Sequence, residues 1–305
     1  MRRIHRFHTA ALATATALSA ALLSACTIGD VSGNNEAETA SQGTEEESVP
    51  QPTLPESAPA PAPATTEDLP VIEATDPQEA LDAIAADNPG TGIAVAGGGT
   101  VFSAGMTDPV AAWSTAKVPL AIAAERAGVA EDGTVTQAIT YSDNAAADSL
   151  WEALGGGQEA AQATQEVIGT NSVPATPPRP GFSAVGQTQW SVTQQAEFVA
   201  SLGCMDGAEP VLAAMAQPDP AQMYGLSTLE GAVKKGGWGP AEDGSYEARQ
   251  MGLVTLGGHT VAVAIYASAD SGDYGDAQQM LTRLAAQLES AEVEWPAAGC
   301  QQGAV

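Results

Sequence analysis

The sequence is poor in basic residues, and above all in lysine. Its 305 residues include ten Lys and Arg against 37 Asp and Glu, which gives a formal net charge of −27. A field of this sign repels phosphate backbones and anionic headgroups, so the composition argues against a nucleic-acid partner. Only three lysines serve the whole chain, and they are Lys117, Lys234 and Lys235.

Histidine and cysteine are equally scarce, with three of each. Two histidines fall within the first eight residues, which leaves His259 in a Gly-Gly-His-Thr stretch typical of a tight turn. A Ser-His-Asp triad or a multi-histidine metal site would need to be built around that one imidazole. No phosphate-binding glycine loop stands out either. We therefore expect no metal and no organic cofactor.

The first 26 residues have the pattern of an export signal. Three arginines among the first six residues precede an uncharged stretch over 9–23, which is short for a membrane span. Leu23-Ser24-Ala25-Cys26 then resembles the bacterial lipobox, in which the cysteine becomes lipid-modified and cleavage occurs before it. An ordinary cleavage site that includes Cys26 by chance is the alternative. We expect a lipoprotein anchored on the extracytoplasmic face of the cell membrane.

Residues 27–75 predict a disordered stalk, because Pro, Glu, Ser and Thr dominate and few apolar residues offset the entropy of ordering. The folded body is expected over 76–305. If Cys26 carries lipid, Cys204 and Cys300 remain, and an exported compartment permits a disulfide between them.

The body predicts an α+β fold in which an antiparallel sheet is flanked by helices and carries an inserted all-helical lobe. Strands are expected at both ends of the body and helices in its middle. The expected strands are 91–96, 100–103, 231–235, 248–256 and 260–268. The first expected helix begins at 76–77. Further helices are expected over 114–127, 144–154, 157–168, 193–202, 211–216 and 276–288.

Ser114-Thr115-Ala116-Lys117 places a hydroxyl at a helix start and an amine three residues later, so both project from one face. A serine needs a base to become a nucleophile, and a lysine held neutral by burial can serve. The N–H groups of the helix start can stabilise an oxyanion. A helix cap beside a solvated lysine is the alternative, because S-x-x-K alone is a weak signal.

Two further motifs follow. Ser142-Asp143-Asn144 precedes an apolar helical run, where Ser142 could relay a proton and Asn144 could hold substrate, or the tripeptide could simply cap the helix. Lys234-Lys235-Gly236-Gly237 lies on a predicted strand, where Lys234 and Gly236 are expected to share a face that lines a groove. A pair of surface lysines is the alternative for this third motif.

The order and spacing of these motifs resemble those of the serine β-lactamase and penicillin-binding D,D-peptidase superfamily. WSTAKVPL (113–120) and ITYSDNAAADSLWEALGG (139–156) resemble segments of class A β-lactamases. The resemblance implies that Ser114 is the acylated nucleophile, with Lys117 as its base or relay. It also implies an oxyanion hole formed by the N–H groups of Ser114 and Gly237. Lys234 would set the local potential, and Arg249 would bind a substrate carboxylate.

Two departures from that family bear on activity. Lys235 stands where the family usually has a Ser or Thr that binds the substrate carboxylate, so Lys235 would either attract that carboxylate or obstruct the groove. Residues 167–196 contain no Asp or Glu, whereas class A β-lactamases carry their deacylating glutamate in this region. Glu166 and Glu197 belong to the flanking predicted helices.

The leading hypothesis is a membrane-anchored serine acyl-transfer protein that forms a Ser114 acyl-enzyme and turns β-lactams over slowly or not at all. Its partner would be a small-molecule or peptidoglycan-like substrate. An active β-lactamase with an altered deacylation route and a non-catalytic envelope ligand-binding lipoprotein remain as alternatives.

Overall fold

A computed structural model describes residue 72 and residues 74–300 of the chain. The expected signal segment, Cys26 and most of the expected stalk lie outside these described residues. The described chain is built on a five-stranded antiparallel sheet with the strand order β2-β1-β7-β6-β5. Its strands are β1 (Thr91–Gly97), β2 (Thr100–Gly105), β5 (Val233–Pro240), β6 (Tyr246–Leu256) and β7 (His259–Ser268).

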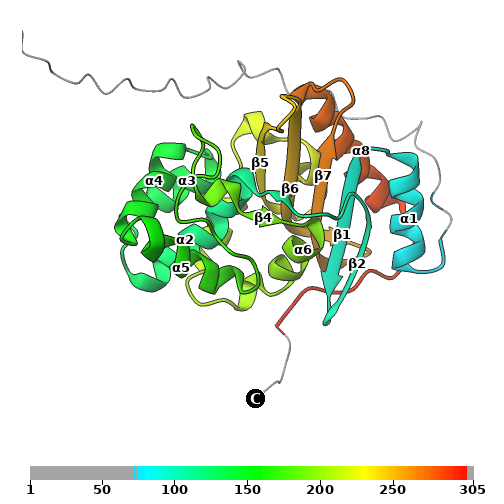
Figure 1. Ribbon diagram of the computed structural model, residues 1–305. Coiled ribbons are helices and arrows are strands. Elements are labelled where there is room, and N and C mark those ends of the chain that lie inside the picture. Colours follow the sequence, from blue (N-terminus) through cyan, green and yellow to red (C-terminus); the bar gives the residue numbers. More distant parts are fainter. Residues whose placement is uncertain (1–71, 73, 301–305) are drawn as a thin grey trace, which may run out of the picture. The chain divides into compact units, whose positions relative to one another are not determined.

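Helices cover both faces of this sheet (Figure 1). Helices α1 (Pro77–Asp87) and α8 (Tyr274–Ser290) pack on one face, and α6 (Val192–Ala200) packs on the other against β1, β6 and β7. Helix α1 begins where Asp76 accepts a hydrogen bond from the Glu79 N–H at 3.0 Å, with proline in the first turn. The sheet therefore separates two apolar cores, one under α1 and α8 and one shared by α6 and the helical lobe.

The helical lobe lies beside β5 in Figure 1, and its helices fall between β2 and β5 in the chain. Helix α2 at its centre is buried over Lys117–Ala124, which explains why its sequence is apolar on nearly every side. A two-stranded ribbon of β3 and β4 joins the lobe to the sheet. The lobe elements are the 3-10 helix η2 (Trp113–Ala116), α2 (Lys117–Ala127), α3 (Thr134–Thr140), α4 (Asn144–Ala153), α5 (Gly157–Ile168) and α7 (Glu209–Met215), and the ribbon strands are Val110–Ala111 and Gln189–Trp190.

This architecture confirms the predicted α+β fold, with three differences in its elements. The helix expected over 114–127 starts as a 3-10 turn, because only from Lys117 does the backbone follow α-helical geometry. The strand expected over 231–235 begins at Val233 and continues through three glycines to Pro240, where pairing with β6 overrides their weak strand propensity. Helix α3 was not predicted, because its seven residues include three threonines and carry little helical signal.

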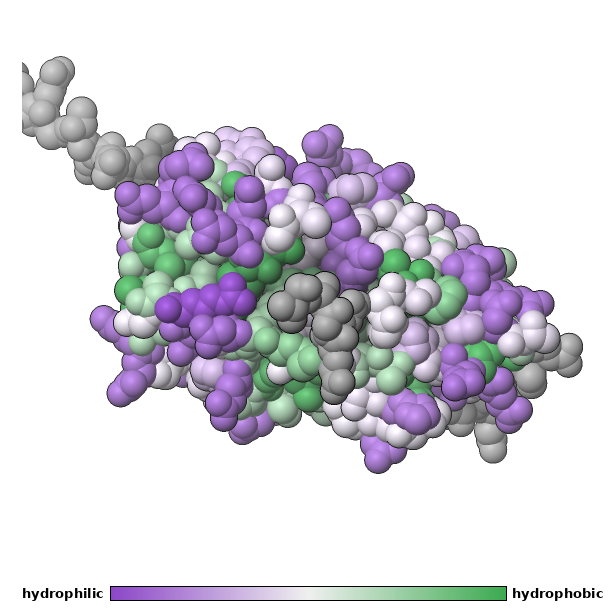
Figure 2. Space-filling model, turned by 90° about the horizontal axis from the view of Figure 1, so that it is seen from below, coloured by the Kyte–Doolittle hydropathy of each residue, from purple (hydrophilic) through white to green (hydrophobic). Residues whose placement is uncertain are grey.

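The surface in Figure 2 is hydrophilic around most of its outline, with hydrophobic residues in patches between. Large apolar side chains described as exposed are Met106, Tyr141 and Met223. Within the described residues no single helix is long and apolar enough to span a membrane. One pair of helical segments is long and apolar enough only when its two members are taken together, and the pair is bent by 119°. The two segments are Val192–Cys204 and Glu209–Met215.

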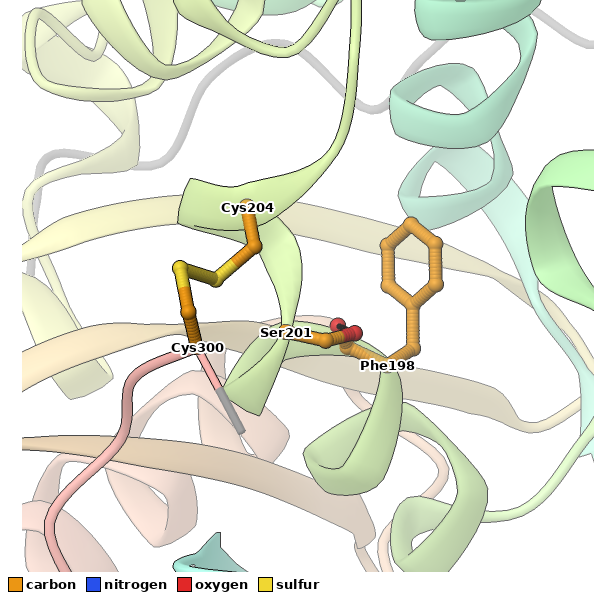
Figure 3. The surroundings of a disulfide bond; sticks show 4 residues. All are labelled: Phe198, Ser201, Cys204 and Cys300. Atoms are coloured by element: carbon orange, nitrogen blue, oxygen red, sulfur yellow. Dashed lines mark hydrogen bonds between the residues drawn. A yellow bond between two sulfur atoms is a disulfide. The ribbon is translucent and has the colours of Figure 1, made fainter. Parts of the chain in front are cut away.

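A disulfide joins Cys204 to Cys300, as the sequence predicted, with the two Cα atoms 5.5 Å apart. Figure 3 shows the bond at the end of α6, where the Ser201 hydroxyl donates to the Phe198 carbonyl at 3.0 Å. The terminal segment reaches this point across the sheet, with the Ala298 N–H donating to the Thr260 carbonyl at 2.8 Å. The bond therefore fastens the last described residues to the face that α6 covers.

Replacing Cys300 by serine should lower the free energy of unfolding by about 2–4 kcal/mol, because a bridge across a long loop restricts the unfolded chain. The bridged residues are 96 positions apart. Urea unfolding of the variant and of the parent chain, each without reductant, measures the difference. Equal midpoints and slopes would contradict this expectation, and a Ser201→Ala variant controls for local packing.

Candidate active site

A cleft of about 470 Å³ separates the helical lobe from the sheet edge at β5. Ser114 lines it from η2, and Lys117, Ser142 and Asn144 line it from the lobe. Much of the remaining wall is aromatic. The aromatic side chains are Trp113, Trp151, Phe182, Trp238 and Tyr246.

Lys117 is buried and holds the first two motifs together. Its Nζ donates to the Ser142 carbonyl and to Asn144 Oδ1, the latter at 2.7 Å, and lies 3.5 Å from Ser142 Oγ. Burial lowers the pKa of Lys117 to about 8, against the opposing charges of Asp143 and Asp148. With such a pKa, roughly one amine in ten is neutral at about pH 7, and the neutral base becomes the main form above about pH 8.

The Ser142-Asp143-Asn144 tripeptide caps α4, and its Ser142 and Asn144 also line the cleft. Asp143 caps α4, because its Oδ1 accepts from the Ala146 N–H at 2.7 Å. Ser142 has a φ of 57°, a left-handed conformation unusual for serine, and this turn directs its hydroxyl toward two lysines. The Ser142 hydroxyl thus lies between the amine of Lys117, which lines the cleft, and the amine of Lys235, which is almost completely buried.

The structure corrects the prediction for the third motif by one residue. Lys235, which is 1% exposed, donates from Nζ to Ser142 Oγ at 2.8 Å and to the Gly236 carbonyl at 2.8 Å. Lys234 lies on the other face of β5, where its Nζ donates to the Gln222 carbonyl at 2.8 Å and lies 5.6 Å from the Tyr224 ring centroid. The expectation that Lys234 and Gly236 face the groove is wrong, because Lys235 and Gly237 occupy that face of the strand.

None of the three lysines is paired with a carboxylate. Over residue 72 and residues 74–300 the single ion pair joins Arg283 to Asp87 on the surface. Burial therefore lowers the pKa of Lys234 to about 7. Burial lowers the pKa of Lys235 well below its ordinary value, and the charges of Lys117 and Lys234 add to that effect.

The open edge of β5 also corrects the oxyanion donor. Along an antiparallel strand, the N–H and C=O of one residue face the same neighbour, and the side alternates from residue to residue. The Gly236 carbonyl accepts from Lys235 and the Pro240 carbonyl accepts from Arg179 at 2.7 Å, so these two residues face away from β6. The backbone N–H and C=O of Trp238 must then also point away from β6 and toward the cleft. The N–H of Trp238, and not that of Gly237, is the strand's candidate donor beside the Ser114 N–H.

Gly237 has a different role, because it allows β5 to approach η2. A Cβ atom on Gly237 would lie 2.8 Å from the Ser114 nitrogen and 2.9 Å from the Thr115 nitrogen. On Gly236 the nearest atom to an added Cβ would be the Tyr224 hydroxyl oxygen, at 3.7 Å. Of these two glycines, only Gly237 is therefore required by contact with the backbone of Ser114 and Thr115.

Arg249 does not reach the cleft, so the predicted role in binding a substrate carboxylate is wrong. Its side chain is fully buried, and its five N–H groups are engaged. The acceptors are the carbonyls of Val110, Ala111 and Trp190 and, twice, Gln195 Oε1. Arg249 joins the β3–β4 ribbon and α6 to the sheet.

The segment between α5 and α6 brings no carboxylate to the cleft. Glu166 in α5 is exposed and accepts from Gln162, and Glu197 is exposed on α6. Arg179 ties the segment to the sheet edge, because its Nη1 donates to the Pro240 carbonyl at 2.7 Å. Its guanidinium carbon also lies 4.7 Å from the Phe182 ring centroid and 5.9 Å from that of Trp113. This arrangement accords with the absence of acidic residues over 167–196.

Sequence reasoning missed three polar residues of the cleft, Asp148, Ser183 and Gln187, and most of its aromatic wall. Asp148 lines the cleft from α4, four residues after Asn144. That spacing was a usable signal, because positions i and i+4 of a helix share a face. Trp238 and Tyr246 carried no comparable signal, since they are brought in by the pairing of β5 with β6.

No protein-family model matches the chain, and no curated protein matches it. Solved structures do match in fold. A β-lactamase from Chitinophaga pinensis DSM 2588 superposes with a TM-score of 0.56 at 16% identity, over 68% of this chain and 96% of that chain. The fold is that of the class A β-lactamases. A variant of the last common ancestor of Gram-negative class A β-lactamases (GNCA4) matches at a TM-score of 0.52 and 20% identity, over 69% of this chain and 95% of that one. The TLA-3 extended-spectrum β-lactamase matches at a TM-score of 0.55 and 14% identity, over 68% of this chain and 98% of that chain.

Replacing Lys235 by methionine should slow the predicted acylation of Ser114 by about 100-fold, the lower end of what a positioned proton-transfer group contributes. Lys234→Met should leave the rate within about threefold, because Lys234 faces the other core. Stopped-flow or quenched mass spectrometry with a penicillin measures both rates. The reverse ranking would restore Lys234 as the residue of the third motif.

Replacing Gly237 by alanine should push η2 away and slow the predicted acylation of Ser114 by roughly 100-fold, because a small misplacement of a reacting hydroxyl is costly. Gly236→Ala is the matched control and should acylate at the parent rate. The same mass measurement reports both variants. Equal rates for the two alanines would mean that β5 and η2 are not in close contact.

Proposed function

We propose that this protein is a membrane-anchored, extracytoplasmic serine acyl-transfer protein that forms an acyl-enzyme on Ser114 and turns β-lactams over slowly. The observation that carries the proposal is the network in which Ser142 Oγ lies 2.8 Å from the Lys235 Nζ and 3.5 Å from the Lys117 Nζ, in the cleft that Ser114 also lines. The lipobox-like sequence that ends at Cys26 supports the anchor. The Cys204–Cys300 disulfide is typical of exported proteins and supports the compartment.

In the acylation step, neutral Lys117 accepts the proton of the Ser114 hydroxyl as Oγ bonds to the acyl carbon. The negative charge that develops on the acyl oxygen is stabilised by the N–H groups of Ser114 and Trp238. Lys117 then returns its proton through Ser142 to the departing nitrogen, and the bond between that nitrogen and the acyl carbon breaks. Lys235 holds the Ser142 hydroxyl in place for this transfer.

The cleft favours an acyl donor with a bulky apolar group beside its reacting carbonyl. Its aromatic wall supplies apolar surface, while Asn144 and the β5 edge supply polar groups that orient a ligand. Arg249 is unavailable to a substrate carboxylate, and Lys235 is nearly inaccessible. A peptide-like envelope substrate is compatible with this chemistry.

Turnover should be slow because the segment between α5 and α6 presents no carboxylate to an attacking water. Release of the acyl group needs a base that takes a proton from water. A base that does not come from this segment has to come from elsewhere in the cleft.

Intact mass spectrometry of the full-length protein with a penicillin tests the proposal, with Ser114→Ala in parallel. The parent chain should gain the mass of one penicillin and keep it over many minutes, and the variant should gain nothing, because it lacks the attacking hydroxyl.

Two results would contradict this proposal in different ways. An adduct that disappears quickly as the drug is consumed would identify an efficient β-lactamase. No adduct on the parent chain, with the same drug affinity in both proteins, would identify a ligand-binding protein.

A further inference from the structure

We propose that Asp148 is the general base that activates the water which releases the acyl group from Ser114. This assignment rests on the proposed function and names the residue through which the acyl-enzyme is hydrolysed. No part of the segment between α5 and α6 is needed for it.

The position of Asp148 on α4 is the first support. Asn144, Ala147, Asp148 and Trp151 all line the cleft, and they follow the i, i+3, i+4, i+7 spacing of one helix face. Asn144 at the start of this stripe accepts from the Lys117 Nζ at 2.7 Å. One turn along, the side chain of Asp148 starts about 6 Å from that of Asn144 on the same helix face. Its charge acts on the Lys117 amine, where it opposes the lowering of the pKa by burial.

Asp148 is also the sole carboxylate among the residues described as lining the cleft. The other acidic side chains of α4 and its cap, Asp143 and Glu152, do not line it. The segment after α5 offers the cleft backbone groups, the Ser183 hydroxyl and the Gln187 amide. A water between Ser114 and α4 therefore has one available carboxylate to which it can give a proton.

The electrostatic surroundings suit a base. Asp148 keeps contact with solvent through the cleft, yet partial burial raises its pKa above the ordinary value. The positive charge of Lys117 opposes this increase, and Glu152 and Asp143 add to it. A carboxylate with a raised pKa accepts a proton from water more readily.

The proposed hydrolysis balances as follows. Asp148 takes one proton from water while the water oxygen bonds to the acyl carbon of the Ser114 ester. The bond between that carbon and Ser114 Oγ then breaks, and the serine oxygen receives the proton from Asp148, directly or through Lys117. The products are a free carboxylic acid and the original Ser114 hydroxyl.

The test compares Asp148→Asn with Glu152→Gln in the full-length protein, because both changes remove one negative charge from the same helix. After a pulse of penicillin and removal of free drug, intact mass spectrometry follows the adduct. Asp148→Asn should lengthen its lifetime at least tenfold, and Glu152→Gln should leave the lifetime unchanged. Asp148→Glu should restore decay to within about fivefold of the parent rate.

Acylation is measured on the same samples, and its rate should change by a much smaller factor in Asp148→Asn than the adduct lifetime does. A purely electrostatic influence of Asp148 on Lys117 would instead shift the pH dependence of acylation and leave the adduct lifetime unchanged.

Equal lifetimes for the parent chain and Asp148→Asn would overturn the assignment to Asp148 and leave the proposed function in place. No adduct on the parent chain would overturn the proposed function, and the assignment with it. Thermal unfolding of each variant establishes that it is folded.

Discussion

The contact between two buried amines and one hydroxyl connects the parts of this molecule. Lys117 comes from the helical lobe and Lys235 from the edge of the sheet, and Ser142 lies between them. Burying an amine without a carboxylate is costly, so each of the two needs acceptors such as this hydroxyl and nearby carbonyls. The docking of lobe against sheet is thus determined at the place where the chemistry is expected.

Strand β5 shows how a single residue step decides which side chain belongs to the site. Its neighbouring lysines carry the same charge, yet one faces the cleft and the other faces the core under α8. Both side chains are buried, so neither charge nor burial distinguishes the lysine of the site from its neighbour. The three glycines at 236, 237 and 239 let the strand continue to Pro240 against β6 and against η2.

The fold was largely predictable from local patterns, because apolar periodicity and glycine punctuation place the hairpin of β1 and β2, the helices of the lobe and the last strands. The motifs on η2 and α4 were predictable for the same reason, since each lies within one element. The side of β5 on which Lys234 lies was not predictable in this way. Neither was the burial of Arg249 or the role of Trp238. These depend on strand register and on packing between distant segments, which no short stretch of sequence specifies.

The burial of all three lysines has a consequence for the reactivity of the chain. Lys117, Lys234 and Lys235 are 5%, 2% and 1% exposed, and the chain has no other lysine. A reagent that acylates amines therefore meets no lysine on the outer surface of the folded protein. Lys117 lines the cleft, and its lowered pKa leaves more of its amine in the neutral form that reacts with acylating reagents. Covalent labels and cross-linkers aimed at lysine would thus report on the cleft, or on unfolding, and not on the surface.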